Sequence, residues 1–333
     1  MDSRRLSASS PLQQPAATVV RGHTERLIQE ADVAICRLAD PNDVQALHDS
    51  RVALRRLRGW LRAFDIELSV KPKRRKALRR LARSTNKARD TEVSLEWLAT
   101  LERKMYPKAL VGLARFSTEL RGMRDKDYRR VRRELPQAWR KLAHKMRRTA
   151  LNGAGKGTPR PFQQDFMASL QAYGQDFERA LARARRTPTP PRIHALRIAG
   201  KRVRYLMETL LPWHPKAEGF MREMKALHDT AGAIQDLQRL IVLSEHSFLH
   251  QAGARYRRLL AQYLDGGADH RTLKRPDFTP SVEPLLWICR AAGQAQADYI
   301  LRFKKTYLGR TTPVCIRELR LLTVALGKGM TTK

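Results

Sequence analysis

Apolar residues recur every three or four positions along most of the chain, which is the spacing of one face of an α-helix. The sustained alternation that marks a β-strand is missing. The pattern predicts an all-α protein. The expected helices lie at about 19–38, 44–67, 72–104, 108–122, 124–149, 162–186, 191–211, 215–247, 251–264, 282–307 and 312–327. Pro136 is expected to start a new helical segment within the fifth of them.

The segment "NGAGKGTPRP", residues 152–161, interrupts this pattern with glycines and prolines that end helices. The segment before residue 19 has neither a helical pattern nor the apolar core of a signal peptide. We therefore expect four parts along the chain, besides a loop at 265–280. They are a disordered leader at 1–18, a first helical bundle at 19–150, a linker at 151–161 and a second helical bundle at 162–330.

The two halves repeat one motif at an offset of 146 residues. "HDSRVALRRLR" starts at His48 and "HALRIAGKRVRY" starts at His194. In both, basic residues stand three, seven, eight and ten positions after the histidine. "ARD" at 88–90 and "IQD" at 234–236 keep the same offset. The repeat predicts a duplicated helical unit, with two tandem bundles related by a pseudo-two-fold axis.

On a helical wheel, each motif gives one narrow basic ridge opposite an apolar face. The helix after the first motif has a similar ridge. The ridge residues are His48, Arg51, Arg55, Arg58 and Arg62 on the first motif helix, Arg79, Arg80, Arg83 and Lys87 on the next, and His194, Arg197, Lys201 and Arg204 on the second motif helix. Arg56 and Arg202 are also candidates, although they lie about 80° off the ridges.

The chain has 66 Lys and Arg against 32 Asp and Glu, a formal charge of +34. Like charges one helical turn apart repel each other, so ridges of one sign indicate a polyanionic partner. Arginine suits phosphate because its guanidinium donates two parallel hydrogen bonds. The few acids beside the ridges, Asp90 and Asp236, are expected to pair with neighbouring arginines.

Several classes of protein do not fit the sequence. Cys36, Cys289 and Cys315 are widely spaced, which excludes a disulfide framework or a CxxC zinc site and favours a reducing cytoplasm. No apolar run is long enough to span a bilayer. The histidines stand beside arginines, which repel a metal ion, and no P-loop is present. We predict no catalytic residue, metal site or cofactor.

The two His-x-x-Arg-x-x-x-[Arg/Lys]-Arg-x-Arg motifs at 48 and 194, "KARD" ahead of "TEVSLEWL", and "LHDTAGAIQDLQRL" resemble the CHAD family (conserved histidine α-helical domain). The resemblance covers roughly residues 19–310. It implies paired helical bundles around a cleft or pore lined with basic residues. It also implies binding of inorganic polyphosphate by the ridge residues, and association with polyphosphate granules. Asp229 and Ala233 depart from the ridge pattern in the second half.

Two alternatives stay open. A nucleic-acid-binding protein, with non-specific contacts, would account for the charge. However, aromatic residues make up only 7% of the chain, and Trp60 and Trp97 lie on apolar faces. A polyphosphate-processing enzyme would need His48 as a phosphorylated nucleophile, without evident metal ligands. The sequence decides neither the oligomeric state, the preferred chain length, nor the cellular purpose of binding, nor whether the ridges line a pore or an open face.

Overall fold

Helices dominate the part of the chain that the computed structural model describes. This part comprises residues 11–68, 70–102, 107–148, 160–211, 214, 217–264, 283–309 and 313–328. These residues include no strand, only one isolated bridge between Pro15 and Pro161. The prediction of an all-α fold is confirmed.

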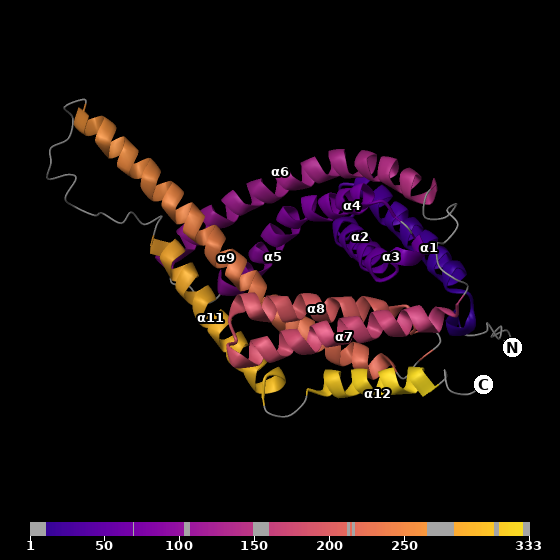
Figure 1. Ribbon diagram of the computed structural model, residues 1–333. Helices are drawn as coiled ribbons and strands as arrows, with labels where there is room; N and C mark the ends of the chain where they lie inside the picture. Colours follow the sequence, from indigo (N-terminus) through magenta and orange to yellow (C-terminus); the bar gives the residue numbers. More distant parts are fainter. Residues whose placement is uncertain are drawn as a thin grey trace, which may run out of the picture. The chain divides into compact units, whose positions relative to one another are not determined.

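The order of elements along the chain is shown in Figure 1. They are η1 (Pro11–Gln13), α1 (Ala16–Cys36), η2 (Arg37–Ala39), α2 (Ala46–Ala63), α3 (Asp65–Leu68), α4 (Pro72–Ser84), α5 (Asn86–Leu101), α6 (Pro107–Met146), α7 (Phe162–Arg186), α8 (Pro190–Glu208), α9 (Ala217–Leu264), α11 (Glu283–Tyr307) and α12 (Val314–Lys328).

The chain divides into two compact units that differ from the two halves of the sequence. Unit 1 comprises residues 1–86, 129–229 and 303–333, and unit 2 comprises residues 87–128 and 230–302. Each half of the sequence therefore contributes to both units. The boundary at 151–161 and the pseudo-two-fold axis stay predictions.

The expected leader contains ordered structure, since η1 and the first turn of α1 fall within residues 11–18. The first ten residues lie outside the described residues, as do most of the expected linker and the whole expected loop at 265–280.

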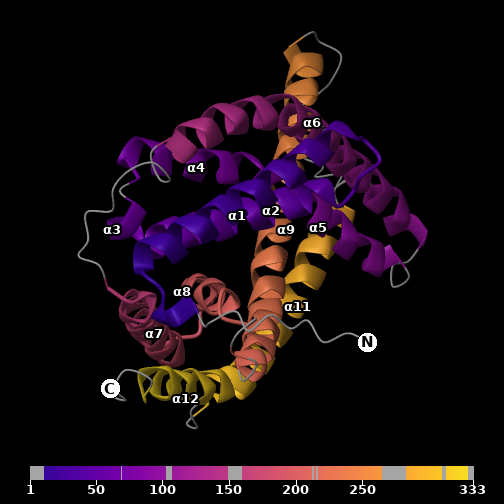
Figure 2. The ribbon, with the colours of Figure 1, turned by 90° about the vertical axis from the view of Figure 1, so that its right-hand side faces the viewer.

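In unit 1, α1 packs against α2, and α7 packs against α8 (Figures 1 and 2). The first helices of the two pairs start side by side, because Ala16 N donates to Arg160 O (2.9 Å) and Phe162 N donates to Gln14 O (2.8 Å). The starts of α1 and α7 are 146 residues apart, as in the sequence repeat. Beside this junction, Trp60 and Phe162 are buried with ring centroids 6.1 Å apart.

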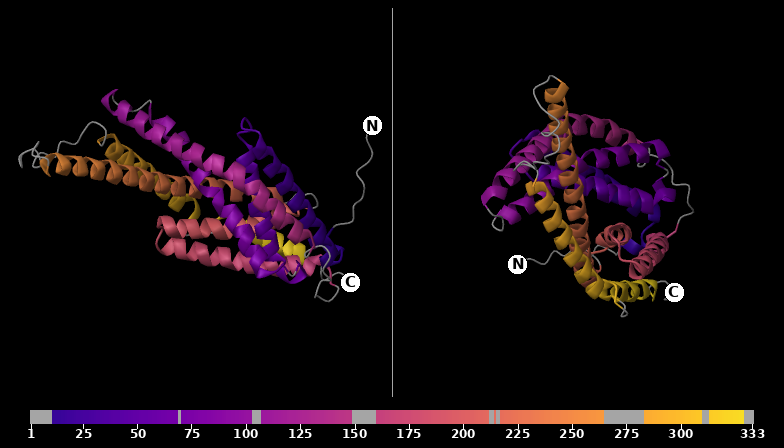
Figure 3. Two further views of the ribbon diagram at one scale, coloured as in Figure 1. Left: turned by 90° about the horizontal axis from the view of Figure 1, so that it is seen from above. Right: turned by 90° about the vertical axis from the view of Figure 1, so that its left-hand side faces the viewer.

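Unit 2 has its own core of leucine and aromatic side chains from α5, α6, α9 and α11, of which α9 and α11 lie side by side (Figure 3). Leu98, Phe116, Leu240 and Ile288 are each almost fully buried in it. Arg239 pairs with both Asp90 (3.0 Å) and Asp236 (3.1 Å). The prediction that these two aspartates pair with neighbouring arginines is confirmed.

Several predicted helix boundaries are wrong. The helix expected at 72–104 is divided at Thr85. At this point the Ser84 hydroxyl donates to Leu81 O (2.8 Å), and the Thr85 hydroxyl donates to Ala82 O (2.9 Å). Such bonds compete with the helical ladder.

Conversely, α6 continues through residue 123 and through Pro136, and α9 joins the helices expected at 215–247 and 251–264. Pro136 has no backbone N–H, so α6 lacks one helical hydrogen bond there. The helix tolerates this loss because buried side chains before and after Pro136, including Leu135 and Trp139, anchor it.

Candidate functional site

The two motif helices place their apolar sides in the core of unit 1. Leu54 and Leu57 of α2 and Leu196 and Val203 of α8 are almost fully buried. The helices also contact each other and approach closely at Gly59, where a Cβ atom would lie 3.6 Å from the Tyr205 ring. Because this packing fixes the rotation of both helices, it fixes the direction of their basic ridges as well.

The ridges of α2, α4 and α8 converge into one group of side chains, which we call the cationic cluster. Arg58 and Lys201 each interact electrostatically with several arginines, and Arg55 is common to both groups. They are Arg51, Arg55 and Arg58 of α2, Arg79 and Arg83 of α4, and Arg197, Lys201 and Arg204 of α8. The sequence placed all eight on ridges, and the structure shows which ridges meet.

Lys201 is a half-buried member of the cluster. Burial lowers the pKa of its amine to about 6, and the charges of Arg197, Arg55, Arg204 and Arg51 contribute to the same shift. A shift of this direction means that the free site disfavours a further positive charge. An anion that entered here would gain both the charge of the arginines and that of a recruited proton.

Arg58 connects α2 with the ridge of α4. Desolvation by neighbouring groups lowers the pKa of its guanidinium, as do the charges of Arg83, Arg55 and Arg79, while Tyr205 opposes the shift. Arg58, Arg79 and Arg83 are exposed, so this part of the cluster is open to solvent. The cluster therefore contains both exposed and half-buried cations.

The cations at the centre of the cluster have no acidic partner among the described residues. Among the described residues, no carboxylate lies within ion-pair distance of Arg55, Arg58 or Lys201. The Nε atom of Arg55 is buried and finds no hydrogen-bond acceptor there. A buried donor without a partner is costly, which favours an external acceptor at this position.

Arg51 and Arg197, the first arginines of the two motifs, make structural contacts. Arg51 is buried, and its Nη1 donates to Thr85 O (2.5 Å) and Asn86 Oδ1 (3.2 Å) at the junction of α4 and α5. Arg197 Nε donates to His228 O (3.3 Å). Both arginines therefore position the helix that follows them, besides adding charge to the cluster.

We expect the variant Arg51→Gln to lose stability because Thr85 O and Asn86 Oδ1 lose a charged donor in a buried place. The expected loss in the free energy of unfolding is about 2–4 kcal/mol. Urea unfolding followed by circular dichroism measures it. Arg62→Gln, an exposed change on the same helix, is the matched control and should change stability little. Equal stability of Arg51→Gln and wild type would contradict a structural role.

Other candidate residues have partners or lie elsewhere. Arg56 pairs with Glu208 (3.1 Å), and Arg202 pairs with Asp176 (3.3 Å), in agreement with their positions off the ridges. Arg204 is in the cluster but also lies 3.5 Å from Glu208.

The interactions by which the cluster is defined do not include the remaining candidates. His48 is an exposed residue of the first turn of α2, and His194 is half-buried in α8. Arg62 and Arg80 are exposed side chains outside the cluster, and Lys87 belongs to unit 2.

His228 of α9 is a member of this site that the ridge pattern did not identify. It lies beside the cluster, and its relative exposure is only 5%. Burial and the charges of Arg204, Lys201 and Arg197 hold the pKa of its imidazole far below the usual value. Neither ring nitrogen has a hydrogen-bond partner among the described residues.

Gly200 makes room for this histidine. A Cβ atom at Gly200 would stand 3.1 Å from His228 Nε2 and 2.7 Å from Met224 Cε. The signal in the sequence was a glycine inside an otherwise strongly patterned basic helix.

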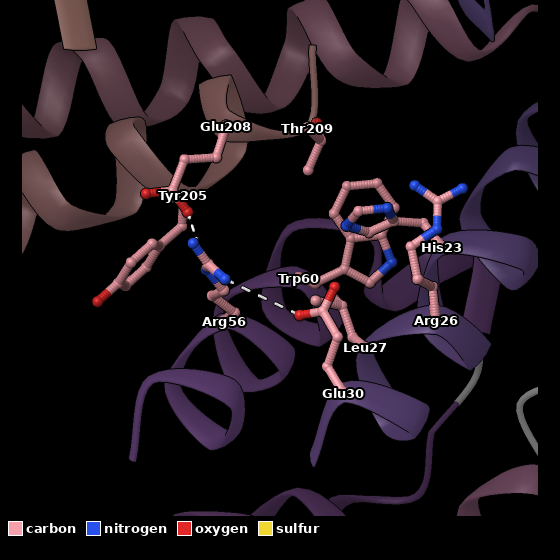
Figure 4. A pocket seen from close by; sticks show the side chains of 9 residues that line it. All are labelled: His23, Arg26, Leu27, Glu30, Arg56, Trp60, Tyr205, Glu208 and Thr209. Atoms are coloured by element: carbon pink, nitrogen blue, oxygen red, sulfur yellow. Dashed lines mark hydrogen bonds and ion pairs between the residues drawn. The ribbon is translucent and has the colours of Figure 1, made fainter. Parts of the chain in front are cut away.

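A pocket elsewhere in unit 1 is balanced in charge. It lies between α1, α2 and α8, and Figure 4 shows Arg56 between Glu208 and Glu30 in it. Arg56 is 3.1 Å from Glu208 and 3.9 Å from Glu30. The His23 ring is tilted against that of Trp60, with ring centroids 4.2 Å apart. Burial and the charges of Arg26 and Arg56 lower the pKa of His23 to about 4. Because its two glutamates balance the charge of its two arginines, Arg26 and Arg56, this pocket is a poorer anion site than the cationic cluster.

The excess charge belongs almost entirely to unit 1. The residues of unit 2 include 18 Lys and Arg and 14 Asp and Glu, a net charge of +4, which leaves +30 of the chain's +34 for unit 1. Unit 1, which contains the cluster, therefore attracts anions more strongly than unit 2 does.

The described residues contain no group of three or more His, Cys, Asp or Glu side chains that could hold a metal ion. No helix within these residues combines the length and the apolar character needed to cross a membrane.

Comparisons with known proteins agree with this architecture. The family model described as CHAD domain matches residues 18–244. The chain is also similar to a structure described as the crystal structure of the CHAD domain from the plant Ricinus communis, with a TM-score of 0.58 and 17% sequence identity. The similarity covers 94% of this chain and 93% of that chain, and it supports the fold. No curated protein matches the chain.

Proposed function

Because the chain belongs to the CHAD domain family, we propose that it binds inorganic polyphosphate through the cationic cluster of unit 1. One observation supports the proposal most strongly. Arg55 and Lys201, from the two copies of the motif, lie together in a desolvated place with no carboxylate partner among the described residues. A folded protein tolerates such uncompensated charge when an anion is its ligand.

Polyphosphate fits the shape and chemistry of the cluster. It is linear and flexible, has a negative charge on each internal phosphate, and has no base to recognise. Arginines can bind successive phosphates by charge-assisted hydrogen bonds without any stacking side chain. The exposed Arg79 and Arg83 would contact one stretch of the chain, while Arg55 and Lys201 would bind another at greater depth. We further propose that the protein associates with polyphosphate granules in the cytoplasm.

We propose a binding protein rather than an enzyme. Phosphoryl transfer needs metal ligands or a positioned nucleophile and base. His48, the candidate nucleophile, is exposed in the first turn of α2 and is not part of the cluster. Burial and the charges of Arg204, Lys201 and Arg197 lower the pKa of His228, which disfavours the protonated imidazole that a general acid needs.

The dependence of binding on salt tests the proposal. Each phosphate neutralised by an arginine or lysine releases condensed counterions, so the logarithm of the binding constant should fall linearly with the logarithm of salt concentration. With about six of the cluster side chains engaged, we expect affinity to fall by about 100-fold or more between 50 and 200 mM salt. Titration of fluorescently labelled long-chain polyphosphate, read by anisotropy, measures it. A binding constant insensitive to salt would contradict the proposal.

A further inference from the structure

A carboxylate connects the cationic cluster with the charge-balanced pocket of unit 1. Glu208 of α8 lies between two arginines, since its Oε2 atom is 3.1 Å from Arg56 Nε and its Oε1 atom is 3.5 Å from Arg204 Nε. Arg204 is a member of the cluster, whereas Arg56 lines the pocket (Figure 4). The side chain of Glu208 is only 17% exposed, and this shelter from water strengthens its attraction to both arginines.

Glu208 stands at one end of the basic ridge of α8. Arg204 follows Lys201 by three positions, so both side chains lie on one face of the helix. Glu208 follows Arg204 by four positions, which places the carboxylate one turn further along that face. Beside this turn α8 contacts α2, where a Cβ atom at Gly59 would be 3.6 Å from the Tyr205 ring. The ridge therefore ends in an acid at its contact with α2.

The two halves of the chain differ at this position. The repeat offset of 146 residues relates Glu208 to Arg62, an exposed cation of α2. By contrast, the same offset preserves one pair of arginine and acid in each half. These pairs are Glu30 with Arg56 (3.9 Å) and Asp176 with Arg202 (3.3 Å). Glu208 is therefore an addition to the repeated ion pairs, and the second half has an acid where the first half has a base.

We propose that Glu208 limits the polyphosphate site, because it occupies Arg204 as an internal counter-anion and keeps phosphate from Arg56 beyond it. The inference rests on the proposed function. A phosphate that approached Arg204 would have to displace the carboxylate, and a phosphate bound next to the carboxylate would be repelled by it. Affinity, and the number of cations that contact the polymer, are thus lower than the arginines of α2 and α8 would otherwise allow.

The variant Glu208→Gln tests the inference, because glutamine keeps the size of the side chain and can accept a hydrogen bond from Arg56 but has no charge. We expect the variant to bind labelled long-chain polyphosphate about tenfold or more tighter than wild type. The dependence of its binding constant on salt should also be steeper, with a logarithmic slope larger by about one, since Arg204 and Arg56 gain contact with phosphate. Anisotropy titrations at several salt concentrations measure both.

The variant Asp176→Asn is the matched control, since it also removes one negative charge from the partner of an α8 arginine, Arg202. We expect it to change affinity less than about twofold. A second test variant, Arg56→Gln with Glu208→Gln, has the net charge of wild type and leaves no arginine without its acid in the pocket. It should still bind about threefold or more tighter than wild type, because Arg204 is released. Equal gains for Glu208→Gln and Asp176→Asn would overturn the inference.

Tripolyphosphate, titrated in parallel by calorimetry, separates this inference from the proposed function. Wild type that binds long-chain polyphosphate, with no gain from either Glu208 variant, refutes the internal counter-anion alone. Wild type that does not bind long-chain polyphosphate refutes the proposed function. In that case, tighter binding of tripolyphosphate by Glu208→Gln than by Asp176→Asn would still support the internal counter-anion.

Discussion

Replacement of Arg55 and Lys201 together by glutamine is expected to weaken polyphosphate binding by about 100-fold or more, since each charge-assisted hydrogen bond contributes about 1.5–3 kcal/mol. The two side chains come from different copies of the motif and meet in the cluster. Neither has a carboxylate partner among the described residues, so their loss leaves no acid unpaired. Anisotropy titration of the double variant against wild type gives the ratio of dissociation constants.

The matched control removes two charges from unit 2. Arg115 and Arg121 are exposed residues of α6, and the variant Arg115→Gln with Arg121→Gln has the same net charge as the cluster variant. We expect the control to bind nearly as well as wild type. Equal losses in the two double variants would mean that binding depends on diffuse charge and would contradict a defined site.

Binding should also take up a proton on Lys201. The pKa of this amine in the free protein is about 6, so the amine is mostly uncharged at pH 7.5. A bound phosphate chain supplies the missing counter-charge and raises that pKa. By linkage, affinity then falls as pH rises above 6, by up to about tenfold for each pH unit until the pKa of the complex is reached. Calorimetry at pH 7.5 in two buffers of different ionisation enthalpy measures the number of protons bound.

The variant Lys201→Arg is the control for proton uptake, because it keeps a cation but has no titration below pH 12. It should bind polyphosphate with little dependence on pH between 6.5 and 9. The free wild-type protein should also become more stable as pH rises from 7 to 9, since over this range the unfolded chain binds a proton that the folded chain does not. Equal proton uptake by wild type and Lys201→Arg would exclude Lys201 as the coupled group.

The sequence predicted the faces of the helices better than their partners. Helical spacing placed Arg55 and Lys201 on ridges opposite buried leucines, and the structure agrees, because the period of an α-helix determines which residues share a face. The period of a helix does not show which residues of other helices lie opposite a given face. The pairing of Arg56 with Glu208 joins residues 152 positions apart, so only the packing of α2 on α8 reveals it.

Two further features depend on tertiary packing. Arg51 occupied a ridge position in the sequence, but its guanidinium is buried against Thr85 O because α4 ends there, in the middle of the helix predicted at 72–104. His228 stood outside every ridge, yet the missing side chain at Gly200 lets it lie beside the cluster. The positions of Arg51 and His228 could be predicted only by knowing which helices pack against each other in the core.

The central claim is that the cationic cluster of unit 1 is a polyphosphate site, and competition against duplex DNA tests it most directly. Both polymers attract a basic surface, but a duplex is stiff, whereas polyphosphate can bend to reach half-buried side chains such as Arg55 and Lys201. In a titration of labelled long-chain polyphosphate at constant salt, we expect unlabelled polyphosphate to displace the probe at about 100-fold lower phosphate concentration than duplex DNA. Displacement by both polymers at the same phosphate concentration would contradict the claim and favour a non-specific nucleic-acid-binding protein.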